Sequence, residues 1–369
     1  MQRWSQGARV TSLMILLVLS AAAWFLGPYP FNYILTAVML VLTLLALYGR
    51  FILCPFLHHL EKICPILQIK KDPRYSPHRI LHQKVKLKLL GVESLRKSLE
   101  PIYLCTACDK CGDSDARLEM RETLIKSGIL PHNLPYLRKA ISEHGNPYSS
   151  PRARHDFLGK GYKTSSETAL FIGCTSSVVP RLRKLAASAV KLLDESGVEF
   201  KLLSNESCCG YILHVHGDFE KAKEIAQENM KTFKEEGVKR IITICPGCYQ
   251  ALKTFYPLED IEVRHILEMI NPKHVPQELV LTLHDPDHMD EFKETTRKLL
   301  KDCKVNESSY PCCGANLISY APKFSMEIAK KMVDESKGTL VTYCPSCYLV
   351  LSRVACDKVK DLYSILLAN

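Results

Sequence analysis

The chain has 369 residues, enough for two or three domains that each bury a core of their own. Its 16 cysteines gather in CxxC and CC groups, a pattern that favours metal ligation over disulfide bonds in a cytoplasmic domain. The formal charge is +10, but the basic residues are spread along predicted helices and form no nucleic-acid recognition module, which argues against a nucleic-acid-binding protein.

Two apolar runs without a charged residue, 10–26 and 31–48, open the chain, and each is near the lower length needed to cross a bilayer. Basic residues flank both outer ends and none lies in the turn at 27–30, which predicts that both termini are cytoplasmic. A cleaved signal peptide is the alternative, because 21–23 could form a processing site. The second run favours a retained two-helix transmembrane hairpin. Neither run contains a histidine, so haem ligation by this part of the chain is not expected.

The following segment is basic and mostly helical in pattern. Its Lys84, Lys86 and Lys88 alternate with apolar residues, which favours a helix lying along an anionic membrane surface. Membrane lipid is therefore an expected partner.

Cys105, Cys108 and Cys111 follow in a CxxCxxC pattern, the ligand spacing of a ferredoxin-type [4Fe-4S] loop. Asp115 occupies the place of the usual fourth cysteine. Two candidates for the fourth ligand remain open. Asp115 could supply an oxygen ligand, or Cys64, which a proline follows, could act as a remote thiolate ligand. Zinc or a three-iron cluster is the alternative for this triplet.

Strands and helices alternate through the rest of the chain, as in a small parallel sheet. The predicted strands are 170–174, 198–203, 238–244 and 339–343, and the helices are 179–196, 218–236 and 324–335. Cysteines follow the strands twice. The first set is Cys174, Cys208, Cys209, Cys245 and Cys248, and the second is Cys312, Cys313, Cys344 and Cys347. Because ligands gather at the carboxyl ends of parallel strands, each set should converge on one rim and bind an iron–sulfur cluster or zinc.

A Cys, then Cys-Cys-Gly, then Cys-x-x-Cys resembles the cysteine-rich CCG domain of heterodisulfide reductase B/D-type subunits and of iron–sulfur subunits of glycolate and lactate oxidation systems. The resemblance covers the chain from Cys105 onward, and the GNPY at 145–148 resembles the family's linker. It implies a non-cubane [4Fe-4S] cluster held by the five cysteines of the first set.

The second repeat departs from the family pattern at Asp287. The sequence HDPDH at 284–288 resembles a motif that has a cysteine in this place. Four thiols suit an ordinary [4Fe-4S] cube or zinc, whereas a non-cubane cluster would need Asp287 or Cys303 as a fifth ligand. Alternatively, this half has lost its cluster and only braces the first.

Three histidines near the cysteines, His214, His216 and His288, are candidates for proton delivery. The alternative for each is an ordinary solvated loop position.

These patterns together predict an α/β protein with four parts. They are a two-helix transmembrane hairpin (1–50), a juxtamembrane and small ferredoxin-like helical iron–sulfur segment (51–160), a first CCG domain (161–275) and a second, degenerate CCG domain (276–369).

The expected function is that of a membrane-anchored iron–sulfur oxidoreductase subunit of heterodisulfide-reductase type, with its metal domains on the cytoplasmic side. It would transfer electrons between a redox partner subunit (a flavoprotein, a ferredoxin-type protein or a membrane cytochrome) and a thiol/disulfide substrate or the quinone pool. No GxGxxG follows a strand and no Walker loop is present, so nucleotide or flavin binding is not indicated. A pure electron relay and a zinc-stabilised membrane scaffold are the alternatives.

Overall fold

The computed structural model describes residues 63–77, 79–112, 114–150, 154–159, 165–273 and 277–367. The predicted hairpin at 1–50 lies outside these residues. Within the described part of the chain, every helix is too short or too polar to cross a bilayer. The described residues belong to one compact unit, Lys62–Asn369.

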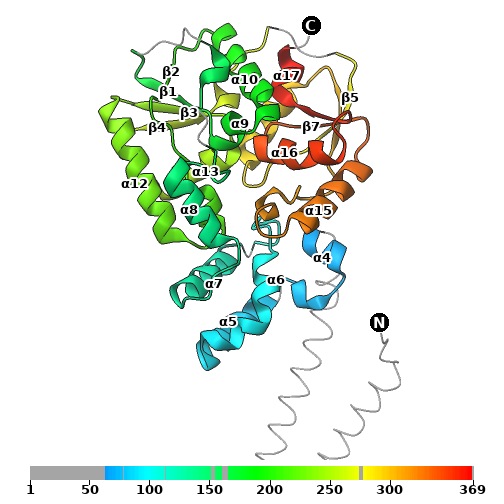
Figure 1. The fold of residues 1–369 in the computed structure, drawn as a ribbon. Coiled ribbons are helices and arrows are strands. Elements are labelled where there is room, and N and C mark those ends of the chain that lie inside the picture. The colour runs from blue at the N-terminus through cyan, green and yellow to red at the C-terminus, as the bar shows by residue number, and fades with distance from the viewer. Residues whose placement is uncertain are drawn as a thin grey trace, which may run out of the picture. The chain divides into compact units, whose positions relative to one another are not determined.

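Helices alone make up the described part of the chain before the first sheet (Figure 1). They are α4 (Pro65–Lys70), α5 (Arg79–Leu90), α6 (Leu99–Tyr103), α7 (Ser114–Lys126) and α8 (Leu134–His144), with short 3-10 turns at Pro73–Tyr75 and Val92–Ser98. The CxxCxxC loop connects α6 to α7. Helix α8 ends where Gly145 adopts a left-handed conformation, which residues other than glycine rarely adopt.

The first α/β repeat is built on a four-stranded parallel sheet in the order β2-β1-β3-β4. Its strands are β1 (Thr168–Phe171), β2 (Lys201–Leu202), β3 (Arg240–Thr243) and β4 (Glu262–His265). Its helices are α9 (Cys174–Val178), α10 (Arg183–Glu195), α11 (Tyr211–Val215), α12 (Phe219–Glu235) and α13 (Pro246–Phe255).

The second repeat has the same strand order, β6-β5-β7-β8, and is again all parallel. Its strands are β5 (Val280–Leu283), β6 (Lys304–Glu307), β7 (Thr339–Thr342) and β8 (Val359–Asp361). Its helices are α14 (Lys293–Leu299), α15 (Pro322–Glu335), α16 (Pro345–Val354) and α17 (Leu362–Leu367). The prediction of two tandem α/β repeats with small parallel sheets is confirmed.

Several predicted strands are shorter than their apolar runs. The run 198–203 contributes only β2, and the first strand ends at Phe171 rather than at Cys174. The cause lies at Gly173, whose φ of 81° turns the chain so that Cys174 begins helix α9. Helix 179–196 is likewise divided, with a 3-10 turn at Pro180–Leu182 before α10.

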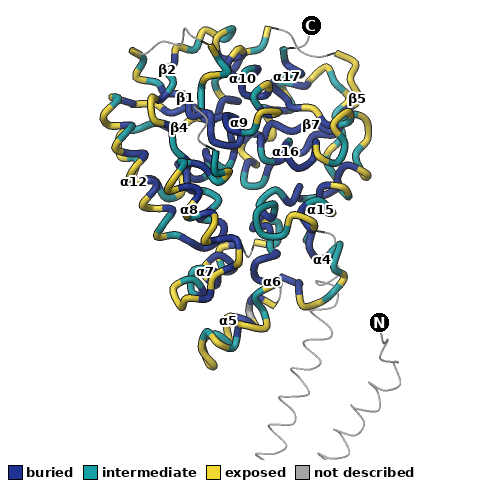
Figure 2. The backbone as a smooth tube through the Cα atoms, viewed as in Figure 1, coloured by how far each residue is buried: buried dark blue, intermediate teal, exposed yellow. Residues whose placement is uncertain are grey.

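One hydrophobic core extends across both repeats, and the second repeat has a further buried cluster around α15 and α16. A single cluster of buried side chains runs from Leu170 on β1 to Leu281 on β5 and Leu366 on α17, and Figure 2 shows the inner strands β1 and β7 as buried. The Tyr363 hydroxyl lies 3.3 Å from the carbonyl of Ile244 and 3.1 Å from that of Tyr343. Because each carbonyl directly precedes a CPxC turn, this buried tyrosine ties the two turns together.

Candidate metal centres

All five thiols predicted for the first centre are buried and line one cavity of about 120 Å³. Cys174 follows β1, the adjacent pair Cys208 and Cys209 follows β2, and the two cysteines of the CPxC turn follow β3. The parallel strands thus bring them to one rim, as their positions predicted. No disulfide links any of the 15 described cysteines, so these thiols are available to a metal.

Glycines beside the thiols keep the cavity open. A Cβ at Gly173 would lie 3.1 Å from Cys248 Sγ, closer than ordinary packing allows. The glycine of each CCG motif is left-handed, with φ of 82° at Gly210 and 77° at Gly314, and a Cβ there would press on helix α12 or α15, respectively. The Gly of the motif therefore serves both the turn and the close approach of that helix.

Each CPxC turn is the start of a helix. Cys245 and Cys344 are the residues before α13 and α16, and a proline fills the first helical position of each. The second cysteine of each turn lies in the first helical turn, where the positive end of the helix dipole stabilises a thiolate. Neighbouring thiols and burial act in the opposite direction and raise the pKa of Cys248, Cys344 and Cys347. The Cys347 N–H donates to Cys344 Sγ at 3.4 Å.

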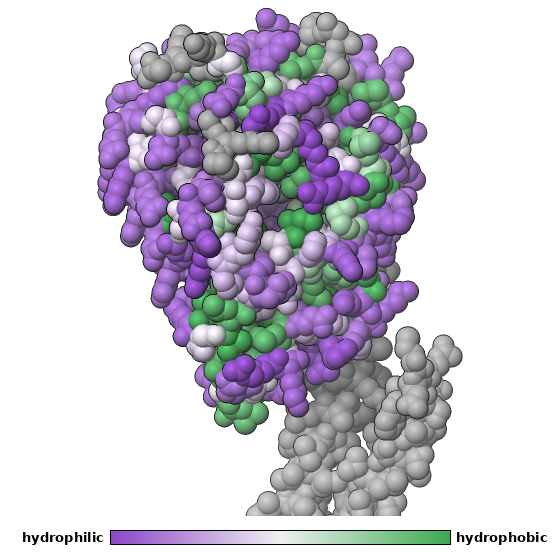
Figure 3. Space-filling model, viewed as in Figure 1, coloured by the Kyte–Doolittle hydropathy of each residue, from purple (hydrophilic) through white to green (hydrophobic). Residues whose placement is uncertain are grey.

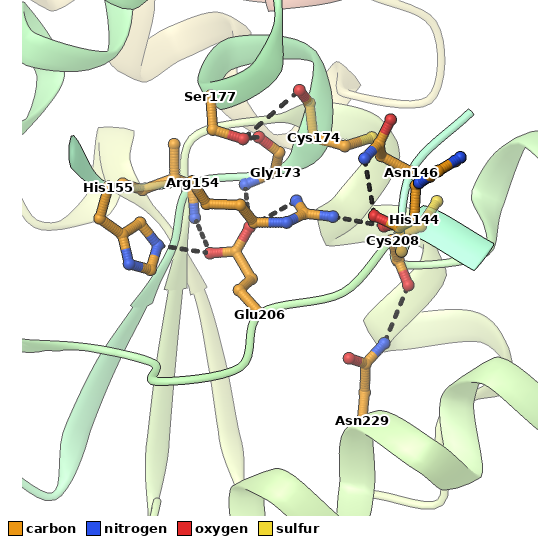
Figure 4. Close-up of polar contacts among 12 residues, drawn as sticks. His144, Asn146, Arg154, His155, Gly173, Cys174, Ser177, Glu206, Cys208 and Asn229 are labelled. Carbon is orange, nitrogen blue, oxygen red and sulfur yellow. Dashed lines mark hydrogen bonds and ion pairs between the residues drawn. The ribbon is translucent and has the colours of Figure 1, made fainter. Parts of the chain in front are cut away.

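A buried ion pair supports the loop before Cys208 (Figure 4). Glu206 accepts the N–H groups of Ile172 and Gly173 at 2.8 and 2.9 Å, and Arg154 Nη1 lies 3.1 Å from its carboxylate. Burial disfavours this charge, but the nearby His155 and Arg154 outweigh it and lower the pKa of Glu206. The pair fixes the chain just before Cys174 to the chain just before Cys208.

The predicted linker also contacts the first centre. The Cys208 N–H donates to the carbonyl of Gly145 at 2.7 Å, and Arg154 donates to the same carbonyl. Tyr148 lines the cavity and its hydroxyl lies 2.9 Å from Thr175 Oγ1. On the other side, Asn229 donates to the Cys208 carbonyl at 2.9 Å (Figure 4).

Thiols of the second repeat line the same cavity. Cys313, Cys344 and Cys347 are buried in it, and the Cys313 thiol donates to Cys347 Sγ at 3.1 Å. Cys245 and Cys344, one from each repeat, are close enough for a hydrogen bond between their thiols. Both repeats therefore present their donors to one shared space.

Strand register places Asp287 where the first repeat has Cys174. Leu170 pairs with the residue three before Cys245, and Leu283 pairs with the residue three before Cys344. Cys174 and Asp287 each lie four residues after those leucines. Asp287 accepts a hydrogen bond from the Cys312 thiol at 3.0 Å, and burial raises the pKa of this carboxyl to about 6.

Sequence reasoning missed His284 as a candidate donor. Its side chain is 2% exposed, and one ring nitrogen lies within 4.8 Å of the sulfurs of Cys313 and Cys347. Its place directly after β5, on the rim where the thiols gather, was the available signal.

The CxxCxxC loop forms a second, smaller site. A cavity of about 30 Å³ is lined by Cys64 together with the three cysteines of the loop. Two residues of the loop, Ala107 and Asp109, have left-handed φ angles of 53° and 57°, a strained conformation that winds the backbone tightly. Asp115 is exposed and does not line this cavity. Of the two candidates for the fourth ligand, the structure therefore places Cys64 beside the loop cysteines and Asp115 outside the site.

The loop docks on the second repeat. Its backbone carbonyls at Thr106 and Ala107 lie 2.9 Å from Asn316 Nδ2 and 2.8 Å from His288 Nε2. Ligand atoms of Cys108, Asp287 and Cys312 all lie within 4.8 Å of one another. The loop therefore lies against the thiols of the second repeat.

Arg121 on α7, which the sequence did not single out, holds the start of the loop. Its buried guanidinium donates to the Cys105 carbonyl at 2.6 Å, to the Ile102 carbonyl at 2.8 Å and to the Val215 carbonyl of the first repeat. It thereby connects the loop to the first repeat.

The other candidates lie away from the shared cavity. The His214 ring stacks on Phe219 and Phe255, and His216 is buried 2.9 Å from Asn133 Nδ2. Cys303 lies at the amino end of β6, opposite the rim that carries the thiols, and Cys356 is exposed.

Comparison with known proteins agrees with this geometry. The family model described as a cysteine-rich domain, CCG, matches residues 168–253 and 282–352, which contain both sets of cysteines and most of each sheet; the edge strands β4 and β8 lie outside the matched residues. The chain is a CCG-domain protein. It is a distant homologue of iron–sulfur proteins of the heterodisulfide reductase D type.

Three relatives of this CCG-domain protein show how the similarity varies in identity and in length. An uncharacterized iron–sulfur protein of Methanococcus maripaludis is 27% identical over 67% of this chain and 56% of its own length. One subunit of the dihydromethanophenazine:CoB–CoM heterodisulfide reductase of Methanosarcina mazei is 26% identical over 71% of this chain and 76% of its own length. The EtfAB:quinone oxidoreductase of Syntrophomonas wolfei is 35% identical over 28% of this chain and 15% of its own. This chain thus spans little more than half the length of several curated relatives.

Proposed function

We propose that this chain is an iron–sulfur oxidoreductase subunit that passes electrons from a redox partner subunit to a thiol/disulfide substrate. The single observation that carries the proposal is the shared cavity, in which thiols of both repeats face one space. The donor set fits iron–sulfur clusters, because buried, unpaired thiols lie at strand ends and at the start of helices.

Three groups of residues would hold metal. Cys64 and the CxxCxxC cysteines would hold a ferredoxin-type [4Fe-4S] cluster, the five thiols of the first repeat a non-cubane [4Fe-4S] cluster, and Cys312, Cys313, Cys344 and Cys347 the cluster of the second repeat. Bound clusters supply storage and transfer of single electrons. The docking of the CxxCxxC loop on the second repeat supports a route from that loop to the cavity.

The cavity would take the substrate. Cleavage of one disulfide bond consumes two electrons and two protons and gives two thiols. The hydroxyls of Tyr148, Thr175 and Ser346 and the amide of Asn316 line the cavity and can orient such a molecule, while Ile212 and Ile318 add apolar surface. The relative with a quinone in its name supports a quinone as the alternative acceptor.

Contact with a membrane belongs to the same proposal. Two apolar runs precede the described residues, and helix α5 exposes Val85, Leu89 and Leu90 beside its lysines. Figure 3 shows hydrophobic surface over the region of α5 and α7. These features support a cytoplasmic metal domain held at an anionic membrane surface.

The test blocks the cavity without touching a thiol. In anaerobic stopped-flow experiments, Ile212→Trp should leave the iron content unchanged but slow reoxidation of the reduced clusters by a low-molecular-weight disulfide at least about tenfold. Ile261→Trp, a matched change at a half-buried isoleucine outside the cavity, should leave that rate unchanged. Equal rates in wild type and Ile212→Trp would instead favour an electron relay without its own substrate site.

A further inference from the structure

The second repeat differs from the first at two matched positions beside its thiols. The register that aligns Asp287 with Cys174 also aligns His284 with Phe171. The Phe171 ring packs edge-on against Phe233 in the core, whereas the second repeat has an imidazole in its place. A nitrogen donor is therefore present in the repeat that lacks the fifth cysteine.

His284 is held rigidly at the rim. Its backbone N–H donates to the Val341 carbonyl at 2.9 Å, which extends the pairing of β5 with β7. Its ring lies beside Cys313 and Cys347, and all three side chains are buried. Among the residues that the structure describes, none hydrogen-bonds to His284 Nε2. A buried polar atom without a partner is costly, and a metal ligand bond would satisfy the ring.

Asp287, the other candidate for a non-thiolate ligand, contacts different cysteines. Its carboxylate accepts the Cys312 thiol and lies in the group that includes Cys108 of the CxxCxxC loop. Cys313 and Cys347 belong instead to the group that contains His284. His284 and Asp287 are therefore members of two different groups of candidate ligand atoms.

We infer that His284 is a nitrogen ligand of the cluster held by the second repeat. This inference rests on the proposed cluster binding and adds a specific ligand to it. Imidazole is an accepted ligand for iron and is found in iron–sulfur centres, where replacing thiolate by histidine raises the reduction potential. A neutral ligand here should raise the reduction potential of the second-repeat cluster above the value that the same cluster would have without it.

The test is pulsed EPR of the full-length, anaerobically purified protein, in which the reduced cluster of the second repeat is identified as the signal lost in Cys313→Ser. Wild type should show a strong nitrogen hyperfine coupling on that signal, and ¹⁵N-histidine labelling should change it in the isotope-specific manner. This measurement needs no variant of His284 and does not depend on turnover.

Substitutions then assign the coupling. His284→Phe, which copies the residue of the first repeat, should remove the nitrogen coupling and lower the midpoint potential or the iron content of that cluster alone. His288→Gln, a nearby histidine that contacts Ala107, should retain the coupling, and so should Asp287→Asn.

The outcomes separate the two claims. A second-repeat signal without strong histidine nitrogen coupling, or with coupling that survives in His284→Phe, overturns the ligand role and leaves cluster binding intact. A protein without iron or acid-labile sulfide would contradict the proposed function itself.

Discussion

At the scale of single residues, Cys64 is the decisive thiol of the CxxCxxC site. It lines the same cavity as the three cysteines of the loop, although it precedes the first of them by 41 positions in the sequence. Burial raises the pKa of its thiol to about 12. A thiol in such an environment ionises only when a nearby cation, such as a metal ion, stabilises the thiolate.

We expect Cys64→Ala to convert the four-iron cluster of the loop into a three-iron form, because only three thiolates remain. EPR of the oxidised protein would detect the new signal. Cys356→Ser, at an exposed cysteine, and Asp115→Asn should both leave the spectrum unchanged. A three-iron signal in Asp115→Asn, together with a native spectrum in Cys64→Ala, would give the fourth ligand to Asp115.

Glu206 has a structural role that can be measured as stability. Glu206→Ala should lower the free energy of unfolding by about 3–5 kcal/mol, because it leaves the Arg154 guanidinium buried without its carboxylate. Denaturant unfolding of the metal-free protein measures this loss. Glu228→Ala, at an exposed carboxylate of α12, serves as the control and should cost less than about 0.5 kcal/mol.

The thiols that gather at the candidate metal sites could be predicted from the sequence, but the polar side chains that support them could not. Cysteine spacing indicated each set of thiols, and the strand ends brought the members of the first set together. Nothing in the spacing identifies Glu206, Arg121 or Tyr363, because each acts on backbone carbonyls or N–H groups far away in the sequence. His284 was overlooked because its neighbour Asp287 held the position of the expected cysteine.

At the scale of elements, α5 is a helix whose exposed side chains do not suit water. Leu89 and Leu90 are 76% and 68% exposed, and the lysines of the same helix favour anionic lipid.

We expect a tryptophan at Leu89 to be quenched by brominated lipids when the full-length protein is reconstituted into anionic vesicles. The measurement uses Leu89→Trp in a background with Trp4→Phe and Trp24→Phe, which removes both native tryptophans. Glu228→Trp on α12 is the control and should not be quenched. Equal fluorescence of Leu89→Trp with brominated and ordinary lipids would contradict contact between α5 and the membrane.

Helices with a clear 3.6-residue period were predicted well, and short strands were not. The predicted helices 218–236 and 324–335 correspond to α12 and α15 within a few residues. The strands predicted from the apolar runs were too long, because the turns that carry the cysteines end the strands early, as at Gly173. The helices α13 and α16 were not predicted, because the sequences at their starts were interpreted only as CPxC turns. Proline at the first helical position is nevertheless a typical start signal.

At the scale of the whole molecule, duplication explains the arrangement. Two parallel sheets of identical order share a core, and Tyr363 ties their CPxC turns, so the thiols of both repeats face one cavity. The repeat of the cysteine pattern predicted the duplication. The common cavity was beyond reach of the sequence because it depends on how the two sheets pack.

The central claim is that these thiols hold iron and sulfide, and metal analysis of the anaerobically purified full-length protein tests it most directly. Iron and acid-labile sulfide should be present in equal amounts, about four of each per cluster, and Cys209→Ser should remove the share of one cluster. Zinc with no sulfide, or an iron content that Cys209→Ser leaves unchanged, would contradict the account.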